Sequence, residues 1–268
     1  MSRRFPFLKG HGTENDFIVL PDPEGVLHGD LDPELVRALC DRRAGLGADG
    51  VLRAVHRDGI WFMDYRNSDG SVSEMCGNGI RVFARYLMEH EGMGNRHLIP
   101  IATRAGVKNI TPEADGSITV NMGIPEVLGE TKVSANGHTW AATHVSMGNP
   151  HAVAFVDSLD EPGPLTEAPE HDAAVYPEGV NVEFVVRRGE GHIAMRVHER
   201  GSGETRSCGT GACAAMVATE LADGMPIRPE GYRVDVPGGR LNVTREGGHI
   251  LLNGPAVLVA EGIWVAGR

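Results

Sequence analysis

The sequence lacks the features that mark membrane-bound, secreted or nucleic-acid-binding proteins. No apolar run approaches the ~18 residues needed to cross a bilayer. The start, MSRRFPFLKG, has no apolar run behind its arginines, so we expect no signal peptide. Basic residues are outnumbered, with 25 Lys and Arg against 36 Asp and Glu and a net charge of −11, which argues against binding to nucleic acid or to anionic membranes. We therefore expect a cytoplasmic protein.

Cysteine is also scarce. Four cysteines in 268 residues cannot form the disulfide scaffold of a small secreted protein, and thiols stay reduced in the cytoplasm. Their spacing contains no CxxC pair, so we expect no zinc site and no other bound metal. A free cysteine is most often a small buried apolar residue, which is our interpretation for Cys40 and Cys213.

Glycine, in contrast, is abundant, with 36 residues in a chain whose apolar and charged contents are those of an ordinary globular protein. Short β-rich runs alternate with glycine-containing turns, which predicts an α+β fold that consists mostly of strands. The predicted strands are Asp16–Leu20, Val51–Val55, Ile60–Tyr65, His97–Thr103, Ser117–Met122, Thr139–Ser146, Ala152–Asp157, Val180–Val186, His192–His198, Tyr232–Val236, Arg240–Thr244 and Ile250–Val257.

Three helices are predicted from local signals, and a fourth from a less regular pattern. Asp32-Pro33-Glu34 is a typical helix start, and we expect that helix to run to about Arg43. A second helix follows Gly77, because Ile80, Phe83, Ala84 and Leu87 recur at helical spacing. A third follows Gly209; its run 212–218 is apolar all round, so we expect it to be buried on every side. The weaker pattern lies near Leu165–His171.

The chain repeats itself at an offset of about half its length. Cys76-Gly-Asn-Gly79 and Cys208-Gly-Thr-Gly211 are 132 residues apart and each precedes a predicted helix. Two looser matches, 15–19 with 149–153 and 50–51 with 181–182, follow at offsets of 134 and 131. A chance recurrence in a glycine-rich chain is the alternative. We favour two pseudo-symmetric halves, 1–125 with Cys76 and 126–268 with Cys208, with the last strands able to cross back to the first half.

A cysteine at a helix start has a distinctive environment. The first N–H groups of a helix have no internal partner, and the helix dipole adds positive charge there. Such a position lowers the pKa of a thiol and binds carboxylates, and the neighbouring glycines let a ligand approach the backbone. Cys76 and Cys208 on opposite faces of one carbon would form a two-base system that inverts a stereocentre, while the helix starts stabilise the developing charge.

Other functions of these two cysteines are possible in principle. A redox disulfide between Cys76 and Cys208 would be an oxidised, inactive state. A hydrolase with a cysteine nucleophile needs one such residue rather than two in equivalent settings. A non-catalytic protein that binds a small dicarboxylate through the two helix starts is the alternative from another class.

Five ordered blocks, which cover nearly the whole chain, closely resemble the diaminopimelate epimerase family. They are Lys9–Phe17 (KGHGTENDF), Asn67–Gly79 (NSDGSVSEMCGNG), Met147–His151 (MGNPH), Pro177–Val182 (PEGVNV) and Glu199–Gly211 (ERGSGETRSCGTG). The resemblance implies a cofactor-independent conversion of LL- to meso-2,6-diaminopimelate, a precursor of lysine and peptidoglycan. It also implies a homodimer and two similar halves, each a mostly antiparallel β-sheet wrapped round a central helix.

The resemblance also implies roles for individual residues. Cys76 and Cys208 become the two bases, Glu199 assists proton exchange or accepts from an ammonium group, and His151 helps to set the protonation of the thiols. The implied substrate-binding residues are Asn15, Asn67, Gly77, Asn78, Asn149, Asn181, Glu199, Arg200, Gly209 and Thr210. Taken singly, an asparagine is as often a turn or cap residue, the pair Glu199–Arg200 could be a surface ion pair, and a buried histidine is often structural.

The chain departs from the family's sequence pattern at two places, and two other families are alternatives. Many members have HGLGNDF where this chain has HGTENDF, and Gly50 replaces a glutamine that contacts substrate in some members. Proline racemases and hydroxyproline epimerases share the two-cysteine logic but typically show MCGHG where this chain has MCGNG. Phenazine-type isomerases share the fold but lack the paired cysteines.

Overall fold

The computed structural model describes residues 4–225 and 228–265 and contains three helices within them. They are α1 (Pro33–Cys40), α2 (Gly77–His90) and α3 (Gly209–Ala222). All three begin where their sequence signals predict, with Asp32, Cys76 and Cys208 as the N-cap residues. No helix in these ranges is long and apolar enough to cross a membrane.

Strands make up most of the remaining structure. Their bounds are β1 (Arg4–Gly12), β2 (Asn15–Pro21), β3 (Gly50–Arg57), β4 (Ile60–Asn67), β5 (Ile99–Thr103), β6 (Gly106–Pro112), β7 (Ile118–Gly123), β8 (Glu126–Ala135), β9 (His138–Ser146), β10 (Pro150–Phe155), β11 (Glu170–His171), β12 (Asn181–Gly189), β13 (His192–Glu199), β14 (Gly203–Thr205), β15 (Tyr232–Val236), β16 (Gly239–Glu246), β17 (His249–Gly254) and β18 (Val257–Val265).

The strands pair in the same order in two compact units. Unit 1 contains residues up to Val120 and from Pro255 onward, and unit 2 contains Asn121–Gly254. In unit 1 the pairings β1–β2, β3–β4, β5–β6 and β6–β7 are antiparallel, while β2–β3 and β4–β5 are parallel. In unit 2 the strands β9, β10, β12, β13, β15, β16 and β17 repeat this pattern. The internal repeat is therefore a repeat of topology.

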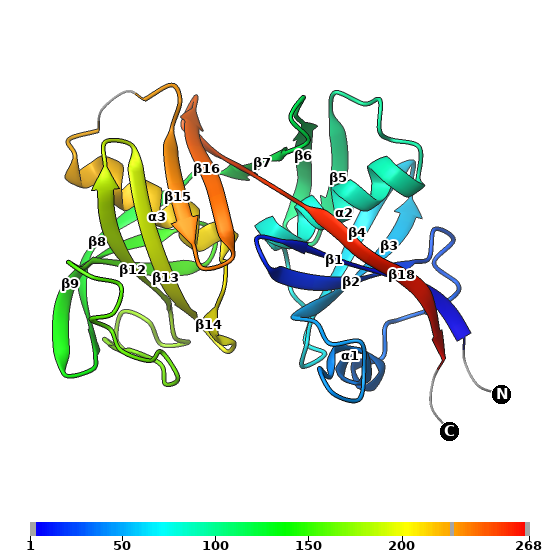
Figure 1. Ribbon diagram of the computed structural model, residues 1–268, viewed down its shortest axis with the longest axis horizontal. Helices are drawn as coiled ribbons and strands as arrows, with labels where there is room; N and C mark the ends of the chain where they lie inside the picture. Colours follow the sequence, from blue (N-terminus) through cyan, green and yellow to red (C-terminus); the bar gives the residue numbers. More distant parts are fainter. Residues whose placement is uncertain (1–3, 226–227, 266–268) are drawn as a thin grey trace. The chain divides into compact units, whose positions relative to one another are not determined.

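The two ends of the described chain lie together in unit 1. Strand β18 (red in Figure 1) runs antiparallel beside β1 (blue), with Phe5 opposite Trp264. The predicted strand 250–257 is thus two strands, because Pro255 interrupts it and the second part pairs in the other unit. Sequence patterns also missed β1, β6, β8 and β14 as strands.

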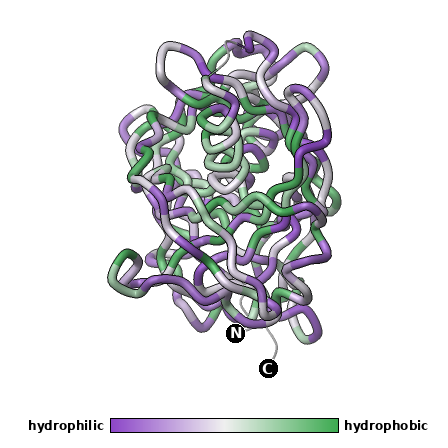
Figure 2. The backbone as a smooth tube through the Cα atoms, turned by 90° about the vertical axis from the view of Figure 1, so that its left-hand side faces the viewer, coloured by the Kyte–Doolittle hydropathy of each residue, from purple (hydrophilic) through white to green (hydrophobic). Residues whose placement is uncertain are grey.

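A central helix lies against the strands of each unit. Helix α2 contacts β1, β2, β3, β4 and β18, and α3 contacts seven strands of unit 2. Residues 212–218 of α3 are all buried, which confirms the expectation from their apolar composition. Figure 2 shows strands around this helix, which is coloured mostly in pale green, toward the hydrophobic end of the scale.

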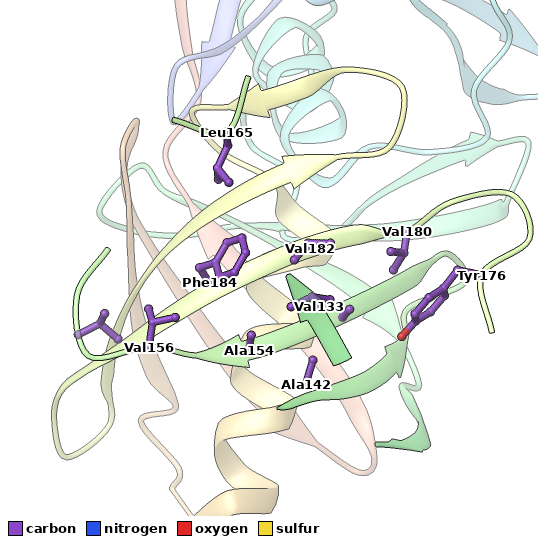
Figure 3. Close-up of a cluster of buried hydrophobic side chains, with 11 residues drawn as sticks. Val133, Ala142, Ala154, Val156, Leu165, Tyr176, Val180, Val182 and Phe184 are labelled. Atoms are coloured by element: carbon purple, nitrogen blue, oxygen red, sulfur yellow. The ribbon is translucent and has the colours of Figure 1, made fainter. Parts of the chain in front are cut away.

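The opposite face of the unit 2 sheet is also buried. Ala154 and Phe184 point away from α3 into a hydrophobic cluster that includes Leu165 and Tyr176 (Figure 3). Side chains alternate between the two faces of a strand, so the neighbours of Ala154 in β10 and of Phe184 in β12 point toward α3. Strand β12 therefore has two buried faces, which explains why its apolar run is nearly continuous.

Two helix predictions need correction. Helix α1 ends at Cys40 rather than near Arg43, because Asp41 is extended and its carboxylate accepts from the N–H groups of Arg43 and Ala44, both at 2.7 Å. The segment 165–171 is not a helix: it covers the sheet, and β11 pairs with β8. Pro169 explains the difference, because proline removes a helical hydrogen bond.

Candidate active site

Cys76 caps the N-terminus of α2 in unit 1. Its backbone is extended, with φ −140° and ψ 124°, and its Sγ accepts a hydrogen bond from the N–H of Gly79 at 3.4 Å. The helix start is well packed, since Gly77, Asn78 and Gly79 are buried. The thiol therefore lies on the positive end of the helix dipole, as its sequence position predicts.

Two predicted substrate-binding asparagines adjoin this thiol. The Oδ1 of Asn15, at the start of β2, lies 3.7 Å from the Sγ of Cys76 and accepts from the Nδ2 of Asn78 at 3.1 Å. Arg81 in turn donates to the Oδ1 of Asn78 at 3.0 Å. The structure thus brings Asn15, Asn78 and Cys76 together in one hydrogen-bonded group.

Sequence analysis missed Asp49, which holds Asn15 from the other side. The Oδ2 of Asp49 accepts from the Nδ2 of Asn15 at 2.7 Å and from the N–H of Asp16 at 3.2 Å. Arg42 bridges Asp49 and Asp16 with contacts of 2.6 and 2.7 Å. Burial alone would raise the pKa of Asp16, but hydrogen bonds from Arg42 and Lys9 outweigh it and hold that pKa below its usual value.

Cys208 caps α3 in the same way in unit 2. Its φ and ψ are −123° and 119°, and its Sγ accepts from the N–H of Gly211 at 3.4 Å. The hydroxyl of Thr210 lies 3.5 Å from the sulfur and accepts from the Nδ2 of Asn149 at 3.3 Å. The predicted residues Asn149, Thr210 and Cys208 are therefore also contiguous.

The electrostatics at Cys208 oppose ionisation. Burial raises the pKa of the thiol well above its usual value, and the negative charges of Glu199 and Glu183 raise it further. Hydrogen bonds from Thr210 and Gly211 act in the opposite direction. Burial and the two glutamates outweigh these donors, so the pKa of the Cys208 thiol stays raised.

His151 is connected to this group through a second residue that sequence analysis missed. Its Nδ1 lies 2.7 Å from the Oε1 of Glu183, and its Nε2 lies 3.1 Å from the Oδ1 of Asn149. Both side chains are fully buried, and burial raises the pKa of Glu183. Asn149 and Thr210 therefore connect His151 to the sulfur of Cys208 through successive hydrogen-bond contacts. An acid within the apolar run VNVEFVV was the available sequence signal for Glu183.

The sheet registers show which residues occupy equivalent positions. His151 is opposite Asn181 in the parallel pair β10–β12, and Phe17 is opposite Gly50 in β2–β3. Phe17 and His151 are therefore equivalent. Gly50 is likewise equivalent to Asn181, and two residues further along β3 and β12 Leu52 is equivalent to Glu183. The contacts of the helix starts agree, because Gly79 packs on Leu52 and Phe17 whereas Gly211 packs on Glu183. An apolar pair in unit 1 is thus replaced by a titratable pair in unit 2.

The other predicted residues make mainly local contacts. The Nδ2 of Asn67 donates to the hydroxyl of Ser71 at 3.0 Å within a turn. Asn181 donates to the carbonyl of Pro150 at 3.0 Å and accepts from the N–H of Arg200 at 2.9 Å. The Arg200 guanidinium is 40% exposed and 4.0 Å from Glu178.

Glu199 accepts a short hydrogen bond from the hydroxyl of Thr205, so β14 helps to hold it.

The two departures from the family pattern have structural explanations. A Cβ at Gly50 would lie 2.6 Å from the carbonyl oxygen of Arg66, so this backbone leaves no room for a side chain there. Glu14 has φ +62°, a conformation that glycine adopts more readily, yet Asn15 still reaches Cys76. The changed loop therefore keeps its asparagine in place.

Each unit therefore contains a thiol on a helix N-terminus that accepts from a backbone N–H and is connected to an asparagine, directly in unit 1 and through Thr210 in unit 2. Such a group can bind a carboxylate and move a proton. Within residues 4–225 and 228–265 no group of three or more His, Cys, Asp or Glu is placed to hold a metal ion.

Solved structures define the class of fold. The chain is similar to a phenazine biosynthesis protein from Bacillus anthracis, with a TM-score of 0.71 and 17% identity over 97% of this chain and 99% of that one. It is also similar to a hydroxyproline epimerase from Agrobacterium vitis, with a TM-score of 0.68 and 15% identity over 98% and 93% of the two chains. The fold is thus the two-unit fold that these proteins share.

Sequence comparison places the chain more narrowly. The profile of the diaminopimelate epimerase family matches residues 7–128 and 143–259. Diaminopimelate epimerases from Streptomyces coelicolor and Corynebacterium glutamicum are 56% and 43% identical, over 98% of this chain in both cases and over 96% and 99% of their own lengths. The chain belongs to the diaminopimelate epimerase family, a family of isomerases.

Proposed function

We propose that this protein interconverts LL- and meso-2,6-diaminopimelate by a two-base mechanism. The observation that carries the proposal is the pair of cysteine caps, because each thiol accepts a helix N–H. Cys76 also lies beside Asn15, and Thr210 connects Cys208 to Asn149. The names of relatives that are 43–56% identical support the substrate.

In this mechanism one thiolate takes the α-proton while the other thiol delivers a proton to the opposite face of the carbon. Negative charge develops on the substrate carboxylate as the proton leaves, and the N–H groups at Gly77-Asn78 and Gly209-Thr210 stabilise it. Helix N-termini are suited to this role because their N–H groups lack partners within the helix. Cys76 and Cys208 exchange roles when the reaction runs in reverse.

The polar residues around the thiols would hold the remainder of the substrate. We assign this role to Asn15, Asn67, Asn149 and Asn181, with Arg200 gripping the distal carboxylate through its planar guanidinium. Two observations support this role. The side chain of Arg200 is 40% exposed, and its backbone N–H donates to the Oδ1 of Asn181. Glu199, which raises the pKa of Cys208, would assist proton exchange or accept from an ammonium group.

The experiment is a stereochemical assay with purified protein. LL-diaminopimelate is incubated alone and with proline or hydroxyproline as separate control substrates, and the isomers are resolved by chiral chromatography. We expect meso-diaminopimelate and no change in either control. Turnover of proline without turnover of diaminopimelate would overturn the substrate assignment, and binding without any turnover would favour the dicarboxylate-binding alternative.

We further propose that the protein is a homodimer in the cytoplasm. Val257, Val259, Ile263 and Val265 are exposed along β18, which supports an interface with a second copy. A cytoplasmic location would keep both thiols reduced, as the mechanism requires. Light scattering during gel filtration should give twice the chain mass of 28.7 kDa; a single chain mass would contradict the dimer.

A further inference from the structure

We infer that the equivalent asparagines Asn15 and Asn149 are turned in opposite senses, so that Cys76 faces an acceptor and Cys208 faces a donor. The geometry assigns Asp49 as the positioning residue that fixes the sense at Cys76. The inference deepens the proposed function, since unequal thiols supply one acid and one base. It is tested below by a measurement that needs no turnover.

At Cys76 the orientation follows from the chemistry of a carboxylate. An ionised carboxylate only accepts hydrogen bonds, so the amide group that faces Asp49 at 2.7 Å must be the NH₂ of Asn15. The Oδ1 of Asn15 then points to the Sγ of Cys76, 3.7 Å away. Asn78 fits the same orientation because its Nδ2 donates to that oxygen. An oxygen acceptor beside the sulfur favours the S–H form.

At Cys208 the asparagine is turned the other way, with its NH₂ rather than its oxygen on the side of the cysteine. The Oδ1 of Asn149 faces His151, and its Nδ2 donates to the hydroxyl oxygen of Thr210. The Nε2 of His151 must therefore carry a proton, and a further proton lies between its Nδ1 and Glu183. Because the Thr210 oxygen accepts from Asn149, its hydroxyl hydrogen is available to the Sγ of Cys208. This donor opposes the rise in the pKa of Cys208 that burial, Glu199 and Glu183 cause.

Neither orienting device occurs in the other unit. The sheet registers make Val180 the equivalent of Asp49, so unit 2 has an apolar residue where unit 1 has this carboxylate. They make Phe17 and Leu52 the equivalents of His151 and Glu183, so unit 1 has two apolar residues where unit 2 has the titratable pair. The two units thus share the cysteine, the asparagine and the helix start. They differ in the group that orients the asparagine, which is Asp49 in unit 1 and His151 in unit 2.

The test compares two substitutions of one residue. Asp49→Asn keeps an acceptor toward Asn15, because the fixed N–H of Asp16 and the NH₂ of Asn15 both point at that oxygen. Asp49→Ala removes the acceptor. Both variants remove the same negative charge and leave Arg42 without one of its two partners. They therefore differ at Asn15 and not in charge.

The measured quantity is the rate of alkylation of each cysteine by iodoacetamide between pH 5 and pH 10, resolved by peptide mass spectrometry. Cys208, in the other unit, is the internal control. The charged groups connected to the Cys76 site, besides Asp49, are the same in both variants: Lys9, Asp16, Arg42 and Arg81.

We expect Asp49→Ala to lower the pH midpoint of Cys76 alkylation by about one unit, which is about a tenfold increase in thiolate at a fixed lower pH. Asp49→Asn should change it by no more than about twofold. An equal shift in both variants would show that charge alone is responsible and would overturn the inference. No shift in either variant, or an equal shift at Cys208, would also overturn it.

Discussion

We expect the N-termini of α2 and α3 to respond differently when a glycine in each is replaced by alanine. The difference tests directly whether their surroundings are unequal. A Cβ at residue 211 would lie 2.7 Å from the Oε1 of Glu183 and 3.3 Å from the Sγ of Cys208. A Cβ at residue 79 would meet only Leu52 and Phe17, at 3.3 and 3.4 Å. Gly79→Ala is therefore a matched control for Gly211→Ala.

The contacts allow the size of each effect to be worked out. At residue 79 the apolar neighbours need to move by only a few tenths of an ångström, and alanine favours a helix by up to about 1 kcal/mol over glycine, so the net change should be within about 1 kcal/mol. At residue 211 overpacking costs about 1–3 kcal/mol, and displacement of Glu183 from His151 costs about 1.5–3 kcal/mol more. After a helix gain of about 1 kcal/mol, Gly211→Ala should destabilise the protein by about 1.5–5 kcal/mol.

Differential scanning calorimetry and the rate of epimerisation test this prediction. A destabilisation of this size lowers Tm by roughly 3–20 °C in a chain of this length. Gly211→Ala should also reduce activity because the new methyl group displaces Cys208, whereas Gly79→Ala should not change Tm by more than about 3 °C. Equal effects of the two substitutions, or a neutral Gly211→Ala, would refute the assigned packing of Glu183.

Three further outcomes are expected. Cys76→Ala and Cys208→Ala should each reduce the rate of epimerisation by at least ~10²-fold, and a wild-type rate in either would contradict the two-base mechanism. Arg53→Met should lower the free energy of unfolding in urea by about 3–5 kcal/mol, because it leaves the buried carboxylates of Asp22 and Asp64 without this partner; a neutral result would show that the pair is not needed. Burial would raise the pKa of Asp64, but Arg104 and Arg66 outweigh it and lower that pKa, so its contribution to stability is present above about pH 4 and is lost as pH falls. Asp64→Asn should be less stable at pH 7 and should lose less stability between pH 7 and pH 3, as followed by urea unfolding.

The features that sequence analysis predicted well depend on local chemistry. Asp32, Cys76 and Cys208 mark helix starts because capping needs only the next few residues, and α3 is buried because its composition is apolar all round. The topological repeat was visible in the sequence because a CGxG motif precedes the central helix of each half.

The features that it missed depend on partners far along the chain. Strands β1 and β18 pair the two ends of the described chain, and neither pattern contains information about the other. Asp49 became part of the site only because its loop folds back on Asn15, and Glu183 only because the register of β10 and β12 places it beside His151. Each contact is set by tertiary pairing, which sequence periodicity does not specify.

Solvent deuterium exchange tests the two-base mechanism most directly. LL-diaminopimelate is converted in D₂O and stopped after a small fraction has reacted, and the α-hydrogen of product and of remaining substrate is analysed by mass spectrometry. If Cys76 and Cys208 act from opposite faces, the meso product carries deuterium while the recovered LL substrate retains hydrogen. Deuterium in the recovered substrate to the same extent as in the product would show that one base serves both faces, and would contradict the mechanism.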